Sequence, residues 1–127
     1  MNQRLTVNLP VHTDSMVFDL VRLDDNHLHF AGRGLPVCHL SADTAMELAR
    51  TLMSATDTES FSGEVAGKLE RFAVLNHDDT VILTVVVGTG NEEERHPIRL
   101  SIGTAFHLAE RLERIVHGID TSPVVLG

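Results

Sequence analysis

Short segments that are typical of strands recur along the chain, and the first of them, Leu5-Thr6-Val7-Asn8-Leu9, alternates apolar and polar residues as a half-buried strand does. They span residues 5–9, 16–23, 27–30, 35–40, 69–76, 81–87 and 95–100. Two of the gaps between them, Asp24-Asp25-Asn26 and His77-Asp78-Asp79-Thr80, have the composition of tight turns. We therefore expect most neighbouring strands to pair as antiparallel hairpins.

Two further segments have the spacing of amphipathic helices. The first is expected from Ser41 to about Ala55 and the second from Ser101 to about His117, and each serine is a suitable N-cap. Gly118 would be a suitable residue just past the second helix. The expected buried stripes are Ala45, Leu48, Ala49 and Leu52 in the first helix, and Ala105, Leu108, Ala109, Leu112 and Ile115 or Val116 in the second.

The chain also repeats itself. Residues 40–52 align with 100–112, with Leu, Ser, Thr, Ala, Leu, Ala and Leu shared, and Phe18 upstream aligns with Phe72. We expect a single domain, 1–127, with one repeat half at 5–55, a junction at 56–68, a second half at 69–118 and a tail at 119–127. Phe61 and Val65 would anchor the junction or form an edge strand.

These elements predict an α+β fold. We expect a two-layer sandwich: a mostly antiparallel sheet of about six strands, with both helices on one face. An internal pseudo-two-fold axis would relate the two strands-then-helix units.

The other face of that sheet is also expected to be apolar. Phe18, Leu20, Phe72 and Val74 alternate onto one face, yet Val21, Leu23 and Leu75, on the other, are apolar as well. An antiparallel sheet with a solvated face should instead alternate cleanly. We therefore expect a homodimer with Val21, Leu23 and Leu75 in its interface. The alternative is that the N-terminal strand or the C-terminal tail covers this face.

Composition narrows the class of partner. The formal net charge is −8, Lys68 is the only lysine, and tyrosine and tryptophan are absent. Such a chain lacks the basic stripe and the stacking aromatics of direct nucleic-acid binders. No apolar run reaches membrane-spanning length and the N-terminus has no signal-type apolar region. With one cysteine, Cys38, the expected compartment is the cytoplasm.

The eight histidines raise the question of a metal site. His27 and His29 would share one strand face, and His39 or His12 could add a ligand. The repeat aligns His27 and His29 with Val81 and Leu83, which confines any such site to one half. No CxxC or HExxH motif is present, so we expect a partly exposed strand face and no metal or cofactor.

No coherent catalytic set emerges. Cys38 and His39 are adjacent in a strand and point to opposite faces, so Cys38 is expected to be a core residue. His107, Glu110, Arg111 and Arg114 are spaced as an ordinary solvated helix face. The paired aspartates fall in turns, where they serve the backbone. We expect no catalytic residues and no enzyme activity.

The loops distinguish the two halves. The segment from Gly88 to Glu94 is long and acidic, whereas its counterpart, Gly32-Arg33-Gly34, is short and basic. Binding and catalytic residues are found disproportionately on loops that a rigid scaffold positions. The expected partner-binding residues are Arg33, Asn91, Glu92, Glu93, Glu94, Arg95 and His96.

The sequence thus predicts a non-catalytic, homodimeric protein-interaction module, such as an adaptor, a chaperone-like protein or a regulatory binding protein, and a basic protein partner suits its charge. Two alternatives remain open. One is a bacterial or phage inhibitor that mimics nucleic-acid charge. The other is a metal- or ligand-binding domain that uses the His27/His29/His39 face.

Overall fold

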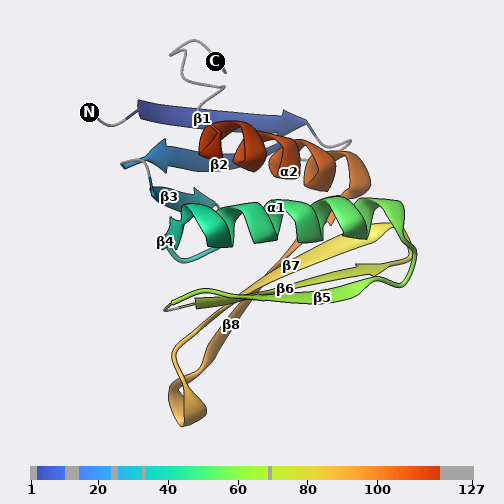
Figure 1. Cartoon of the computed structure of the whole chain (residues 1–127). Helices are drawn as coiled ribbons and strands as arrows, with labels where there is room; N and C mark the ends of the chain where they lie inside the picture. The colour runs from blue at the N-terminus through green and yellow to red at the C-terminus, as the bar shows by residue number, and fades with distance from the viewer. Residues whose placement is uncertain (1–2, 11–14, 24–25, 33, 69, 118–127) are drawn as a thin grey trace.

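The computed structural model describes residues 3–10, 15–23, 26–32, 34–68 and 70–117 (Figure 1). Four strands and a helix are followed by three strands, a short 3₁₀ turn, a fourth strand and a second helix. The elements are β1 (Gln3–Pro10), β2 (Ser15–Arg22), β3 (His27–Gly32), β4 (Cys38–Ser41), α1 (Ala42–Asp57), β5 (Ser62–Ala66), β6 (Glu70–His77), β7 (Thr80–Val87), η1 (Gly90–Glu92), β8 (Glu94–Ser101) and α2 (Ile102–Val116).

The fold is α+β, as predicted, but its strands form two sheets. Each is a four-stranded antiparallel meander, β1-β2-β3-β4 in the first sheet and β5-β6-β7-β8 in the second. In place of the expected sheet of about six strands, the described residues form eight strands in two sheets. Helix α1 follows β4 directly, so the chain leaves the first sheet before β5 begins the second. Strand β5 lies inside the expected junction, 56–68. It pairs only with β6, where Val65 lies opposite Phe72, so β5 is an edge strand of the second sheet.

Both helices begin where the sequence predicts. The Ser41 hydroxyl accepts a hydrogen bond from the Thr44 amide and the Ser101 hydroxyl from the Thr104 amide, each at 3.1 Å. These are N-cap interactions, which satisfy amide groups that a first helical turn leaves unpaired. The predicted stripes are buried: Ala45, Leu48, Ala49 and Leu52 in α1, and Ala105, Leu108, Ala109, Leu112 and Ile115 in α2. Gly118 lies outside the described residues.

The helices do not share one face of a single sheet. Helix α1 contacts β3 and β4 of the first sheet and β5 and β6 of the second, while α2 contacts β1 and β2 and also β7 and β8. The two helices also pack on each other (Figure 1). Each sheet therefore rests on both helices, and the buried residues form one continuous core cluster. No helix in the described part of the chain is long and apolar enough to cross a membrane.

The strand register corrects one detail of the sequence repeat. Leu20, Phe30 and Cys38 lie side by side in the first sheet, as Val74, Leu83 and Ile98 do in the second. Leu28 and Phe30 thus occupy the positions of Val81 and Leu83, which the sequence alignment had assigned to His27 and His29. The one-residue difference arises in the turns, because β6 and β7 are joined by only Asp78 and Asp79, at φ of 52° and 61°.

Asn76 ties the second sheet to the end of α1. It is 3% exposed, and its Nδ2 donates hydrogen bonds to the carbonyls of Ala55, at 2.6 Å, and Thr58, at 3.4 Å. Its backbone amide donates to the Phe61 carbonyl at 2.9 Å. The side chain thus satisfies carbonyl groups at the C-terminus of a helix, where no intrahelical partner exists. No local sequence pattern around Asn76 predicts this role.

Replacing Asn76 with alanine should lower the free energy of unfolding by about 1–3 kcal/mol, because buried helix-end carbonyls lose their donor. Urea denaturation followed by circular dichroism measures this. The control is Asn91→Ala on the exposed η1 turn, which should change stability by no more than about 0.5 kcal/mol. Equal effects of the two substitutions would contradict the assigned role.

Candidate functional site: the outer face of the second sheet

The second sheet has one face toward the helices and one away from them. Residues that alternate inward, including Val65, Phe72, Val74, Leu83 and Val85, are buried. The opposite side is called here the outer face of the second sheet. The register aligns its residues in rows across the four strands: Ser62, Leu75, Ile82 and Arg99 in one row, and Glu64, Ala73, Thr84 and Pro97 in the next.

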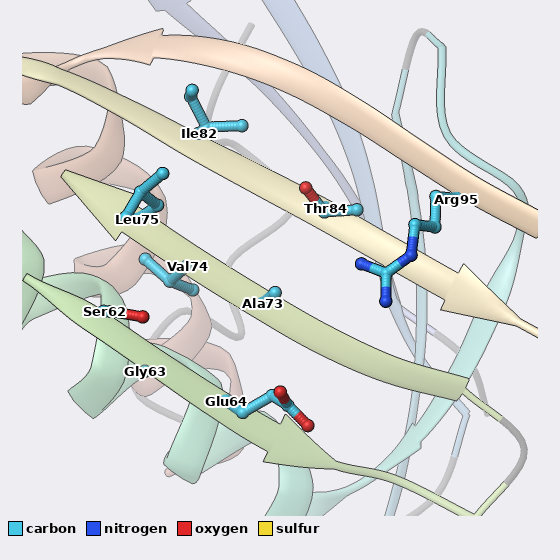
Figure 2. Close-up of a pocket in the computed structure, with 9 residues that line it drawn as sticks. All are labelled: Ser62, Gly63, Glu64, Ala73, Val74, Leu75, Ile82, Thr84 and Arg95. Carbon is cyan, nitrogen blue, oxygen red and sulfur yellow. The ribbon is translucent and has the colours of Figure 1, made fainter. Parts of the chain in front are cut away.

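The centre of this outer face is apolar and hollowed. Leu75 is 41% exposed, one of the most exposed large apolar side chains in the described residues. Ala73 and Ile82, beside it, are half-buried. A shallow hollow of about 430 Å³ lies over them, with Glu64 reaching in from β5 and Arg95 from β8 (Figure 2). An exposed apolar strip with a polar rim is typical of an interaction surface.

Charges of opposite sign lie at opposite edges of the outer face. Glu64, on edge strand β5, is exposed, as are Arg95 and Arg99 on the other edge strand, β8. Arg95 Nε lies 3.3 Å from Glu93 Oε1. The face is therefore acidic on one side, apolar in the middle and basic on the other.

Arg71, Glu93 and Arg95 form an ion-pair cluster at one end of this face. Glu93 accepts from Arg71 as well as pairing with Arg95. Both arginines are register partners of Val86, which is only 3% exposed although it belongs to the outer face. The stems of arginine side chains cover apolar surface well. Residues 81–87 are apolar on both faces of the strand, and this cover accounts for the burial of Val86 on the outer one.

The predicted acidic loop forms the end of a long hairpin. Strands β7 and β8 extend away from the helices and are joined through η1 (Figure 1). Gly88 has φ of 83°, and a Cβ atom there would lie 2.5 Å from the Glu92 carbonyl oxygen, so the turn requires glycine. Asn91, Glu92, Glu94 and Arg95 are exposed.

Two of the other predicted partner-binding residues are less exposed to solvent. Glu93 is half-buried and pairs with two arginines, which gives it a structural part in the hairpin. His96 is half-buried as well, and its Nε2 lies 3.5 Å from Glu94 Oε2. The hairpin thus brings six of the seven predicted residues together. Arg33 lies outside the described residues.

The predicted dimer residues do not form one patch. Val21 lies on the outer side of the first sheet as the register partner of His29, and Leu23 follows the end of β2; both are half-buried. Leu75 lies on the outer face of the second sheet. The assumption that β2 and β6 share a sheet is wrong. Whether Val21, Leu23 and Leu75 lie in a dimer interface stays a prediction.

The histidines lie on the outer side of the first sheet. His29 and His39 are register partners on β3 and β4, with ring centroids 5.5 Å apart and planes tilted by 49°. His27 lies on the same face of β3, opposite Ser41. Among the described residues no group of three or more side chains is arranged to hold a metal ion. His12 is outside these residues.

Cys38 is a fully buried core residue. Burial, with the nearby Glu70 carboxylate as a lesser cause, raises the pKa of its thiol from 9.0 to about 12. The nucleophilic form of cysteine is the thiolate, which this environment disfavours at neutral pH. His39 on the adjacent position faces the opposite side of the sheet.

This pKa predicts an alkaline loss of stability. Unfolded chains release the thiol proton above pH about 9, whereas the native chain retains it to about 12, so the stability contributed by this group is complete below about 9 and falls between the two values. Denaturant midpoints measured from pH 8 to 12 should show this decline. Tyrosine, whose phenol also loses its proton at alkaline pH, is absent from the chain.

The control is Cys38→Ala, which is expected to be less stable at every pH because it leaves a cavity, but to lose less as the pH rises. Parallel curves for the two proteins would show that Cys38 does not cause the alkaline decline.

Comparison with known proteins identifies the fold class and nothing more specific. No protein-family model matches the chain, and no curated protein matches it. Among solved structures, the chain is similar to one in the crystal structures of Trypanosoma bruciei MRP1/MRP2, with a TM-score of 0.55. The match covers 94% of this chain and 86% of that chain at 11% sequence identity. At this identity the similarity concerns the fold alone.

Proposed function

We propose that this chain is a small, acidic, non-catalytic protein-interaction module of the cytoplasm that acts as a homodimer. A second copy covers the outer face of the second sheet. The observation that carries the proposal is the exposed apolar strip around Leu75, bounded by Glu64 at one edge and by Arg95 and Arg99 at the other. A surface with this order of charges is complementary to itself.

The charge order selects one arrangement of the two copies. A two-fold axis parallel to the strands places β5 of one copy over β8 of the other, so that Glu64 faces Pro97 of the second copy and lies between its Arg95 and Arg99. An axis perpendicular to the strands would place like charges together, which is unfavourable. We therefore propose a face-to-face sheet sandwich of the first kind, with aligned strands.

The size of the face sets the expected strength of the dimer. Strands β6, β7 and β8 are eight residues long and β5 is five. With strands about 4.8 Å apart and about 3.3 Å per residue, they give a face of about 450 Å². Two such faces bury about 900 Å² in total, which is below the range of stable specific interfaces and within that of weak ones. We therefore expect a weak dimer, so that the average mass in solution rises with protein concentration.

We further infer that the two strands-then-helix units are an internal duplication related by a pseudo-two-fold axis. Three observations support this: the shared element order, the matched Ser41 and Ser101 caps, and the common register of the two sheets. The two outer faces differ, however. His29 and His39 on the first sheet correspond in register to Ile82 and Arg99 on the second, so only the second carries the apolar strip with charged edges.

Leu75→Glu should shift the protein to monomer, because it places a carboxylate in the desolvated centre of the interface. Light scattering over a range of protein concentrations measures the mass. The matched control is Phe106→Glu on α2, since Phe106 is 40% exposed against 41% for Leu75 and lies outside the proposed interface. A wild-type protein that stays monomeric at high concentration would refute the dimer.

Charge reversal tests the arrangement itself. Glu64→Arg alone and Arg99→Glu alone should each weaken the dimer, because each brings like charges together across the two-fold axis. The double variant restores opposite charges and should recover most of the affinity, as a double-mutant cycle by sedimentation equilibrium would show. Additive losses in the double variant would exclude this arrangement.

The hairpins supply the partner-binding surface of the proposed dimer. A two-fold axis parallel to the strands leaves both β7–β8 hairpins at the same end of the assembly. Each presents exposed Glu92 and Glu94, so the pair forms a divalent acidic surface for a basic protein segment. Acidic residues also occur on α1, α2 and the β6–β7 turn. This spread favours a protein-interaction module over a mimic of nucleic-acid charge, which requires clustered carboxylates.

A fluorescent oligo-arginine peptide provides the simplest probe of the hairpin. The double variant Glu92→Lys/Glu94→Lys should bind it at least about tenfold more weakly at low salt, since like charges then meet. The control reverses two exposed carboxylates elsewhere, Glu47→Lys/Glu113→Lys, and changes net charge equally. Fluorescence anisotropy measures the affinity for the peptide. An equal loss of affinity in both variants would show that net charge alone causes the effect and would contradict the role assigned to the hairpin.

A further inference from the structure

We propose that His29 and His39 form a two-histidine binding site for a divalent late first-row transition-metal ion, with Cu²⁺ preferred over Ni²⁺ and Zn²⁺. The site lies on the outer side of the first sheet, so it is independent of the proposed dimer face on the second. The observation that carries it is the placement of two imidazoles on directly opposed positions of β3 and β4, with ring centroids 5.5 Å apart.

The geometry of the pair fits coordination of one ion. Opposed residues of antiparallel strands have Cβ atoms about 4.5–5.5 Å apart, and both side chains stand on the same face. Two imidazoles that bind one ion at about 2.0–2.1 Å have ring centres about 5 Å apart. The observed separation is within a small side-chain rotation of that value. Because strand pairing holds both Cβ atoms in place, little ordering is needed when the ion binds.

Exposure also suits an ion that binds from solution. His39 is exposed and His29 is half-buried, so an ion held between them is open to water on its outer side. The protein supplies two ligands and water completes the coordination shell. The absence of a third ligand among the described residues separates this site from a closed structural zinc site. The order of preference follows the general rise in affinity toward Cu²⁺ among divalent first-row ions.

Neighbouring residues allow sharp controls. His27 lies on the same strand and the same face, but its register partner is Ser41 rather than a histidine. It is thus a histidine of similar setting that lacks an opposed imidazole. In the second sheet the positions of His29 and His39 are taken by Ile82 and Arg99, neither of which binds such ions. The proposed site is therefore confined to the first half of the chain.

The test is calorimetric titration of the untagged, metal-free full chain with Cu²⁺ and, separately, with Ni²⁺. His29→Gln and His39→Gln should each weaken binding by about tenfold or more, since losing a direct ligand costs at least as much as losing an outer-shell partner. His27→Gln should bind within about twofold of wild type, as expected for a residue outside the coordination shell. Circular dichroism confirms that each variant is folded.

The contrary outcomes are equally definite. Binding that survives in both His29→Gln and His39→Gln places the ion elsewhere and overturns the proposal. An equal loss in His27→Gln would replace the two-histidine site with a different ligand set. A wild-type protein that binds neither ion at micromolar concentration also refutes it. None of these results affects the dimer proposal. That proposal concerns the second sheet and is tested by the mass of the protein in solution.

Discussion

The packing of each helix against both sheets is the constraint on which the rest of the structure depends. Helix α1 lies against β3 and β4 and also against β5 and β6, and α2 makes the corresponding contacts with the remaining strands. Neither half could bury its own helix stripe and sheet face without the other half. The inner faces of both sheets are thereby buried. The outer faces, edges and loops remain available for contacts with other molecules.

Much of this fold could be predicted from local pattern. Ser41 and Ser101 begin helices because a serine hydroxyl satisfies a free amide at the first turn, and that interaction needs no tertiary information. The stripe from Ala45 to Leu52 is buried because its spacing defines one helix face. The division into two sheets could not be predicted this way, because alternation shows that a strand has two faces but not which strands share a sheet.

The candidate site shows the same division between local and long-range information. Sequence singled out Leu75 as apolar on a face that should be polar, and the structure leaves it exposed. Grouping it with Val21 failed because these residues lie in different sheets. The tie from Asn76 to the Ala55 carbonyl was missed because its partner is 21 residues away and its role exists only once α1 packs on β6. The hairpin residues were predicted to bind a partner because their composition differs from that of the matching loop, and this stays a prediction.

The one-residue shift between the halves shows how a small change in a turn redirects surface chemistry. Because side chains alternate along a strand, register decides which residues face the core and which face solvent. The two-residue turn at Asp78 and Asp79 sets Val81 and Leu83 inward, whereas in the first sheet Leu28 and Phe30 face inward. His27 and His29 are consequently directed outward with His39. The two halves keep the same core while their outer faces carry different side chains, and so different binding capacities are available on one framework.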